Sequence, residues 1–176
     1  MTMADSAPLK AVDIVVGLRL AEAPDAQYGQ LGADLGISTS TAHASVRRLQ
    51  GAGLLRPSSR RVNWLAFQEF LAHGLRYAFP ARPGERTRGI PTAHSGPPLA
   101  HHIVAGDVIV WPDPAGPAVG EAIAPLYPQA PQLPRRSPAA YEMVTLADAI
   151  RVGGPRERRR ALEEIGARVR RRAAAG

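Results

Sequence analysis

The 176-residue sequence contains no cysteine, and Lys10 is the only lysine among its 22 cationic side chains. The lack of thiols excludes disulfide bonds and thiolate metal sites, and it is typical of a reducing compartment. No apolar run approaches the ~20 residues that a membrane helix needs. No signal-peptide pattern is present either, because Asp5 precedes any apolar stretch and no basic start leads into one. The sequence therefore predicts a cytoplasmic protein with no membrane partner.

Recognisable catalytic patterns are also missing. The chain has no GxSxG, no HExxH and no phosphate-binding P-loop. His94, His101 and His102 lie in one loop region, but adjacent histidines rarely bind the same ion, and the spaced ligands typical of metal sites do not occur there. We therefore expect no enzyme activity, no metal and no cofactor.

Acidic residues are absent from one particular window. The net charge is +7, and no Asp or Glu lies between Asp34 and Glu69, whereas five arginines do. Basicity alone is weak evidence, because this arginine-rich and alanine-rich composition is also typical of a GC-rich genome. A long stretch with charge of one sign, however, is what a phosphate-facing surface requires.

The stretch "LGADLGISTSTAHASVRRLQGAGLL", residues 31–55, overlaps this window and predicts two helices joined by a glycine turn. The first covers residues 28–35 and ends at Gly36, since glycine adopts the left-handed conformation without steric cost. The second covers 38–53, with Ser38 as its N-cap. Its apolar stripe is narrow, and its opposite side collects small, hydrogen-bonding and cationic side chains. Such a side suits insertion into the major groove of DNA.

The next stretch, "GLLRPSSRRVNWL", predicts a basic hairpin. Two short strands would flank a turn at residues 57–59, with Arg56, Arg60 and Arg61 near the tip. A basic hairpin directly after such a helix is typical of a wing. The alternative is a solvated helix and an ordinary hairpin on a basic protein.

Residues 8–66 resemble the winged helix-turn-helix domain of bacterial transcriptional regulators, particularly the MarR-like and IclR-like kinds. The matching stretches are "LKAVDIVVGLRLA", "YGQLGADLGISTSTAHASVRRLQGAGLL" and "RPSSRRVNW". In these regulators the second helix of the pair enters the major groove, and the wing touches the DNA backbone or minor groove. The resemblance implies DNA contacts by Ser38, Thr39, Ser40, Thr41, His43, Ala44, Arg47, Arg48, Arg56, Arg60 and Arg61.

Each group of these residues has an expected role. Arg47 and Arg48 would read base edges or phosphates, with Ser40, Thr41 and His43 as nearer contacts. Ser38 and Thr39, at the helix start, would meet phosphate, and the three arginines near the hairpin tip would hold the backbone.

The remaining two thirds of the chain carries no resemblance. The predicted fold is mainly α with a small β component, divided into a winged helix-turn-helix (8–66), a connecting helix (67–79), a Pro/Gly-rich region with a short hairpin (80–137) and two C-terminal helices (138–174). The hairpin would pair residues 108–111 with 118–123 around "PDPAG". The loop 91–107 is expected to be ordered.

The second C-terminal helix carries an apolar stripe that indicates how the protein assembles. Leu162, Ile165 and Val169 form a stripe too narrow for a full core face, and it resembles a helix–helix seam. This seam favours a homodimer with C-terminal contacts around a two-fold axis. The basic tail "RVRRRAAAG", residues 168–176, is either a DNA-backbone arm or a complement to the helix dipole.

The sequence therefore predicts a sequence-specific transcriptional regulator, a repressor that binds double-stranded DNA as a homodimer. The alternative is an interaction module, such as an antitoxin-like component that regulates its own operon. In that case the proline-rich middle and the C-terminal half would wrap a protein partner.

Overall fold

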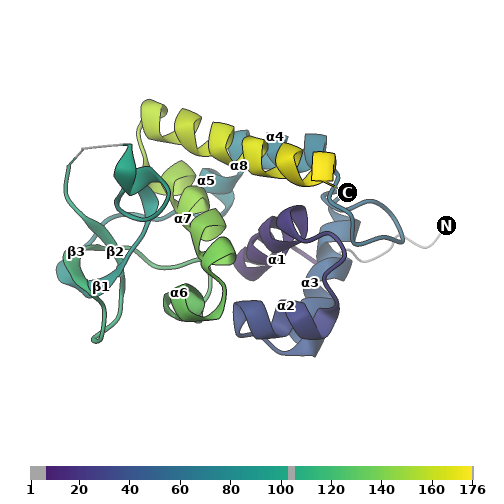
Figure 1. Ribbon diagram of the computed structural model, residues 1–176, viewed down its shortest axis with the longest axis horizontal. Helices are drawn as coiled ribbons and strands as arrows, with labels where there is room; N and C mark the ends of the chain where they lie inside the picture. The colour runs from purple at the N-terminus through teal and green to yellow at the C-terminus, as the bar shows by residue number, and fades with distance from the viewer. Residues whose placement is uncertain (1–6, 103–105, 176) are drawn as a thin grey trace.

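The computed structural model describes residues 7–102 and 106–175 (Figure 1), and these are mainly helical with a small mixed sheet. The helices within them are α1 (Ala11–Glu22), α2 (Tyr28–Leu35), α3 (Thr39–Gly51), α4 (Trp64–His73), α5 (Leu75–Ala78), α6 (Leu133–Arg136), α7 (Pro138–Val152) and α8 (Pro155–Ala175). The strands are β1 (Arg86–Pro91), β2 (Ile109–Pro112) and β3 (Ala118–Ala122). None of the described helices combines the length and apolar character needed to span a membrane.

The turn between α2 and α3 forms at the predicted place. Gly36 has φ 69°, and the backbone N–H groups of Gly36 and Ile37 both donate to the carbonyl of Gly32. The Ser38 hydroxyl accepts the N–H of Thr41 at 3.1 Å, which confirms the predicted N-cap. The two helices thus meet through a tight turn that fixes the direction of α3.

The predicted hairpin after α3 is shorter than expected. A single antiparallel bridge joins Leu55 to Val62, and between them the backbone N–H of Arg56 donates to the carbonyl of Arg61 at 2.9 Å. Ser58 turns the chain with φ 55°. Because α4 begins at Trp64, no length remains for longer paired strands. We call residues 56–61 the basic loop.

The hairpin predicted for residues 108–123 is wrong. β2 and β3 are parallel to each other, and both are antiparallel to β1, so the three strands close on themselves. After β2 the chain turns at Asp113 and crosses β1 instead of reversing beside β2. The crossing needs glycines: a Cβ at Gly116 would lie 2.2 Å from the backbone of Gly89, and one at Gly89 would lie 2.0 Å from the carbonyl oxygen of Trp111.

The C-terminal helices pack within the chain. Ser137 caps α7 and Pro138 begins it, as predicted, and most of α7 is buried. In Figure 1, α8 runs along the top of the molecule, with α4 behind it and α7 below. Ile165 is fully buried on α8, among contacts with α7, α4 and α1. The apolar stripe predicted as an intermolecular seam is therefore used largely inside one copy.

One hydrophobic core contains residues from all four segments that were predicted from the sequence. A fully buried carboxylate, Asp148 on α7, joins several of them: it accepts hydrogen bonds from Thr92 (2.8 Å), the indole of Trp111 (2.7 Å) and the guanidinium of Arg151 (2.7 Å). Burial raises the pKa of Asp148, and the Arg151 charge opposes that shift. The Pro/Gly-rich region is thus tied to α7.

The loop 91–107 is structured over the residues that can be described. It forms two short 3₁₀ turns, Ala93–Ser95 and Leu99–His101, whereas 103–105 lie outside the described residues. The imidazole Nε2 of His94 lies 3.0 Å from the carbonyl oxygen of Asp107. Across 7–102 and 106–175, no three His, Asp or Glu side chains gather as metal ligands would.

Candidate nucleic-acid interface

Helix α3 buries one side and exposes the other. Ala42, Val46 and Leu49 are buried, and α3 contacts both α1 and α2. Of the predicted contact residues, the exposed ones are Ser38, Thr39, Ser40, His43 and Arg47, and the half-buried ones are Thr41 and Ala44. The structure thus brings these seven predicted residues together at the N-terminal and outer part of α3.

Arg48 does not lie on this exposed side. Its Nε and Nη2 donate to the two carboxylate oxygens of Asp13 at 2.8 and 2.7 Å, and Asp13 is completely buried in α1. This hydrogen bonding raises the pKa of the Arg48 guanidinium above its ordinary value. Asp13 also accepts the backbone N–H of Lys10 at 2.7 Å. Arg48 therefore clamps α3 to the first turn of α1, a role that the helical pattern alone did not indicate.

The C-terminal half braces the turn that precedes α3. The Tyr127 hydroxyl donates to the carbonyl of Leu35 at 2.8 Å, and Arg136 Nη1 donates to the carbonyl of Ala33 at 3.2 Å. Both bonds satisfy carbonyls at the end of α2, and Arg136 adds a cation at the negative end of that helix. Burial raises the pKa of Tyr127 far above its ordinary value. Sequence reasoning missed both contacts.

A small aromatic and cationic cluster joins α2, α3 and the basic loop. The ring of His43 stacks on Tyr28, with centroids 3.5 Å apart and an interplanar angle of 21°. The guanidinium carbon of Arg60 lies 4.9 Å from the centroid of the same Tyr28 ring. The structure thus brings two predicted contacts, His43 and Arg60, onto one tyrosine. Tyr28 was not predicted as part of the site. Its aromatic ring at the first position of α2 was the feature of the sequence that could have indicated it.

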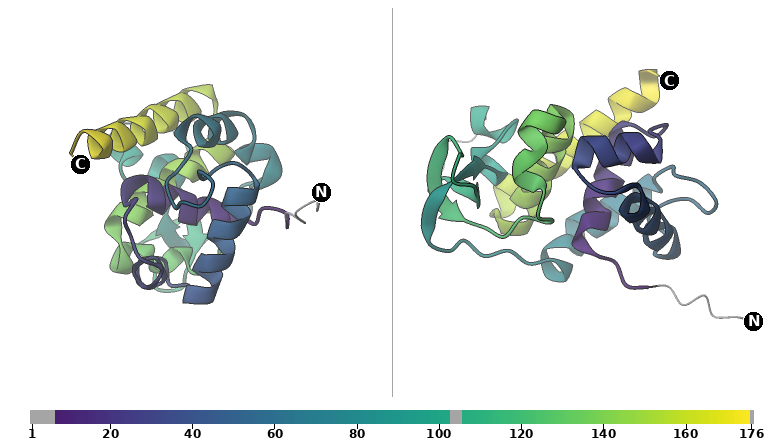
Figure 2. Two further views of the ribbon diagram at one scale, coloured as in Figure 1. Left: turned by 90° about the vertical axis from the view of Figure 1, so that its right-hand side faces the viewer. Right: turned by 90° about the horizontal axis from the view of Figure 1, so that it is seen from below.

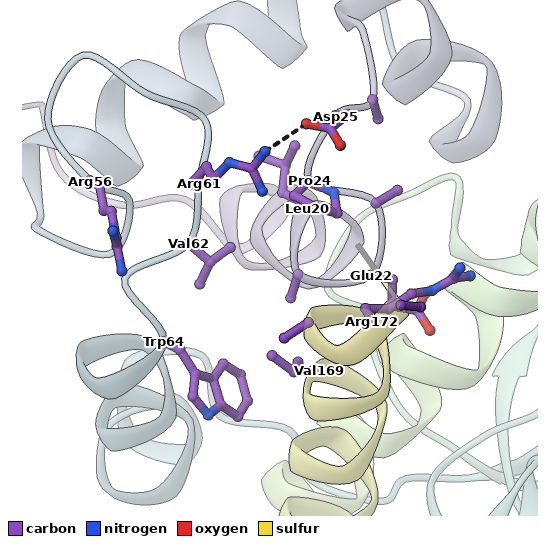
Figure 3. Close-up of a pocket in the computed structure, with 15 residues that line it drawn as sticks. Leu20, Glu22, Pro24, Asp25, Arg56, Arg61, Val62, Trp64, Val169 and Arg172 are labelled. Carbon is purple, nitrogen blue, oxygen red and sulfur yellow. Dashed lines mark hydrogen bonds and ion pairs between the residues drawn. The ribbon is translucent and has the colours of Figure 1, made fainter.

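The other two arginines of the basic loop border an open groove (Figure 3). Arg61 forms an exposed ion pair with Asp25 at 3.0 Å, and Arg56 is exposed. The groove separates this loop from the C-terminal turns of α8, and its lining includes Trp64, Val169 and Arg172. Arginines of the basic loop and of α8 therefore border one groove.

Comparisons of the chain with protein-family models, with characterised proteins and with solved structures give no match.

Proposed function

We propose that this protein is a sequence-specific DNA-binding transcriptional regulator of the winged helix-turn-helix type. In this proposal α2, the Gly36 turn and α3 form the helix-turn-helix, and the basic loop is a short wing. The observation that supports it most is the exposed side of α3. Small polar residues and Arg47 face outward there, and no carboxylate occurs in the chain between Asp34 and Glu69.

The proposed contacts fall into two classes. We expect Ser40, His43 and Arg47 to meet base edges, because they are exposed along α3 beyond its first residue. Ser38 and Thr39 at the start of α3 would bind phosphate, as would the arginines of the basic loop. Arg48 serves indirectly, because its bond to Asp13 sets the position of α3 on α1.

We also propose that two copies bind an inverted repeat and repress by occupying it. One winged domain buries little DNA surface, and two recognition helices about 34–36 Å apart would match one turn of DNA. Because Ile165 is buried inside one copy, the stripe of Leu162, Ile165 and Val169 offers only half-buried side chains to a second copy. Leu65 and Tyr77, 79% and 75% exposed, are the most exposed large apolar side chains among the described residues, and we place the contacts there.

A partner-wrapping module would need an extended proline-rich segment. The described part of residues 80–137 instead buries Trp111, Ile123 and Leu133 in the common core. DNA binding therefore remains the function we propose.

The test is selection of duplexes from a random library, followed by affinity measurements on the enriched sequence. Arg47→Ala should weaken binding about 5- to 150-fold for each bound copy, as expected for losing one contact worth about 1–3 kcal/mol in each half-site. Arg82→Ala, an exposed arginine outside the interface, is the matched control and should bind like the wild type. The proposal is wrong if no sequence is enriched, or if Arg47→Ala retains full affinity.

A further inference from the structure

The last turns of α8 are basic and are held firmly in place. Four arginines follow Glu164, with no acidic residue after it. One of them, Arg168, forms ion pairs with Glu142 on α7 and, at 3.6 Å, with Glu22 at the end of α1. Arg168 therefore fixes this end of α8 to the same helix that supports α3.

This end of α8 lies next to the basic loop. Arg56 and Arg61 border one side of the groove in Figure 3, and Val169 and Arg172 lie on the α8 side. In Figures 1 and 2 the basic loop lies between α3 and the C-terminal end of α8, on one side of the molecule. A rod-shaped ligand that lies across α3 and the loop therefore continues toward α8.

Arg170 and Arg171 are not used by the fold. Both are exposed, and neither takes part in a hydrogen bond or ion pair within residues 7–102 and 106–175. A Cβ at Gly166 would lie 3.2 Å from Nη1 of Arg170 and 3.9 Å from the indole of Trp64, so Arg170 lies on the side of α8 that faces Trp64. Arginines that only complement the helix dipole would hydrogen-bond to the last backbone carbonyls of α8, and Arg170 and Arg171 make no such bond within the described residues.

We infer that the C-terminal end of α8 is a second phosphate-binding surface, on which Arg170 and Arg171 contact the DNA backbone beside the segment read by α3. This inference rests on the proposed function. The added contacts carry no sequence information, because phosphates are the same at every base pair. They raise affinity for every duplex alike, make binding more sensitive to salt, and lengthen the protected DNA on one side of each half-site.

The experiment compares three double variants in salt titrations of duplex binding. Arg170→Gln/Arg171→Gln removes the proposed contacts. Arg156→Gln/Arg159→Gln removes the same charge from exposed positions about 20 Å away along the same helix. Arg170→Lys/Arg171→Lys keeps the charge. The probes are the enriched duplex and an unrelated duplex, each of about 30 base pairs, or about three turns.

The expected result is a difference between the two ends of α8. Arg170→Gln/Arg171→Gln should flatten the plot of log affinity against log salt by about 1.8 for each bound copy, since each copy loses two contacts, or by about 3.6 when two copies bind. The change should appear on both duplexes. The Arg156/Arg159 control and the lysine variant should keep the wild-type slope, and the ratio of affinities for the two duplexes should not change.

Two outcomes separate this inference from the proposed function. If the wild type prefers the enriched duplex, but Arg170→Gln/Arg171→Gln shows the same salt slope as the Arg156/Arg159 control, the surface on α8 is refuted and the proposed function stands. If the wild type prefers no duplex, the proposed function fails, and this inference fails with it.

Discussion

The ion pair between Arg48 and the buried Asp13 predicts that Arg47 and Arg48, adjacent in α3, affect stability differently when each is replaced by alanine. Arg48→Ala removes two charge-assisted hydrogen bonds and leaves the fully buried Asp13 carboxylate with the backbone N–H of Lys10 as its remaining partner. Removing one partner of a buried ion pair costs about 3–5 kcal/mol. Because the Arg48 side chain is 13% exposed, water reaches the pair and the lower value of about 3 kcal/mol is expected.

For a chain of 176 residues, that loss lowers Tm by about 6–12 °C. Urea unfolding followed by circular dichroism measures the loss directly. Arg47→Ala is the matched control, since Arg47 is exposed, and it should stay within about 0.5 kcal/mol of the wild type. Asp13→Asn/Arg48→Met, which removes both charges, should recover much of the stability that Arg48→Ala loses. Equal stability of Arg47→Ala and Arg48→Ala would refute the clamp.

Three further variants test the rest of the fold. Asp148→Ala leaves the buried Arg151 without its carboxylate and should cost about 3–5 kcal/mol in urea unfolding; a loss below 1 kcal/mol would contradict the tie between α7 and the sheet. Gly89→Ala would bring a Cβ to 2.0 Å from the carbonyl of Trp111, so the variant should be recovered mainly unfolded, and normal thermal unfolding would disprove the close crossing of the strands. Burial raises the pKa of Tyr141 from 10.0 to about 12. The stability that the protonated Tyr141 adds is therefore fully present below pH 10 and is lost as the pH rises through about 12. Over that range Tyr141→Phe should lose less stability than the wild type, and identical profiles of urea midpoint against pH would contradict this.

Local signals were sufficient for the helices around the candidate site. Gly36 ended α2, Ser38 capped α3, and Ser137 with Pro138 began α7, because each signal acts within a few residues of its own position. The exposed side of α3 followed from helical spacing alone, as Ser40 and Arg47 show.

Contacts between distant parts of the chain were not predictable in this way. Helical spacing placed Arg48 beside Arg47, but its partner Asp13 lies 35 residues earlier. The Tyr127 hydroxyl donates to the carbonyl of Leu35 at the end of α2, which lies 92 residues earlier in the chain. The strands after β1 had the composition of a hairpin, and their parallel pairing depends on close backbone approach at the crossing. In each case the deciding partner is absent from the local pattern.

Interference by guanine methylation on the enriched duplex tests most directly whether α3 enters the major groove. N7 of guanine lies in that groove, and a methyl group there blocks an arginine contact. The account predicts that methylated guanines within each half-site prevent binding of the wild type, and that Arg47→Ala loses this sensitivity at one guanine per half-site. Binding that is indifferent to N7 methylation, or an interference pattern shared by the wild type and Arg47→Ala, would contradict it.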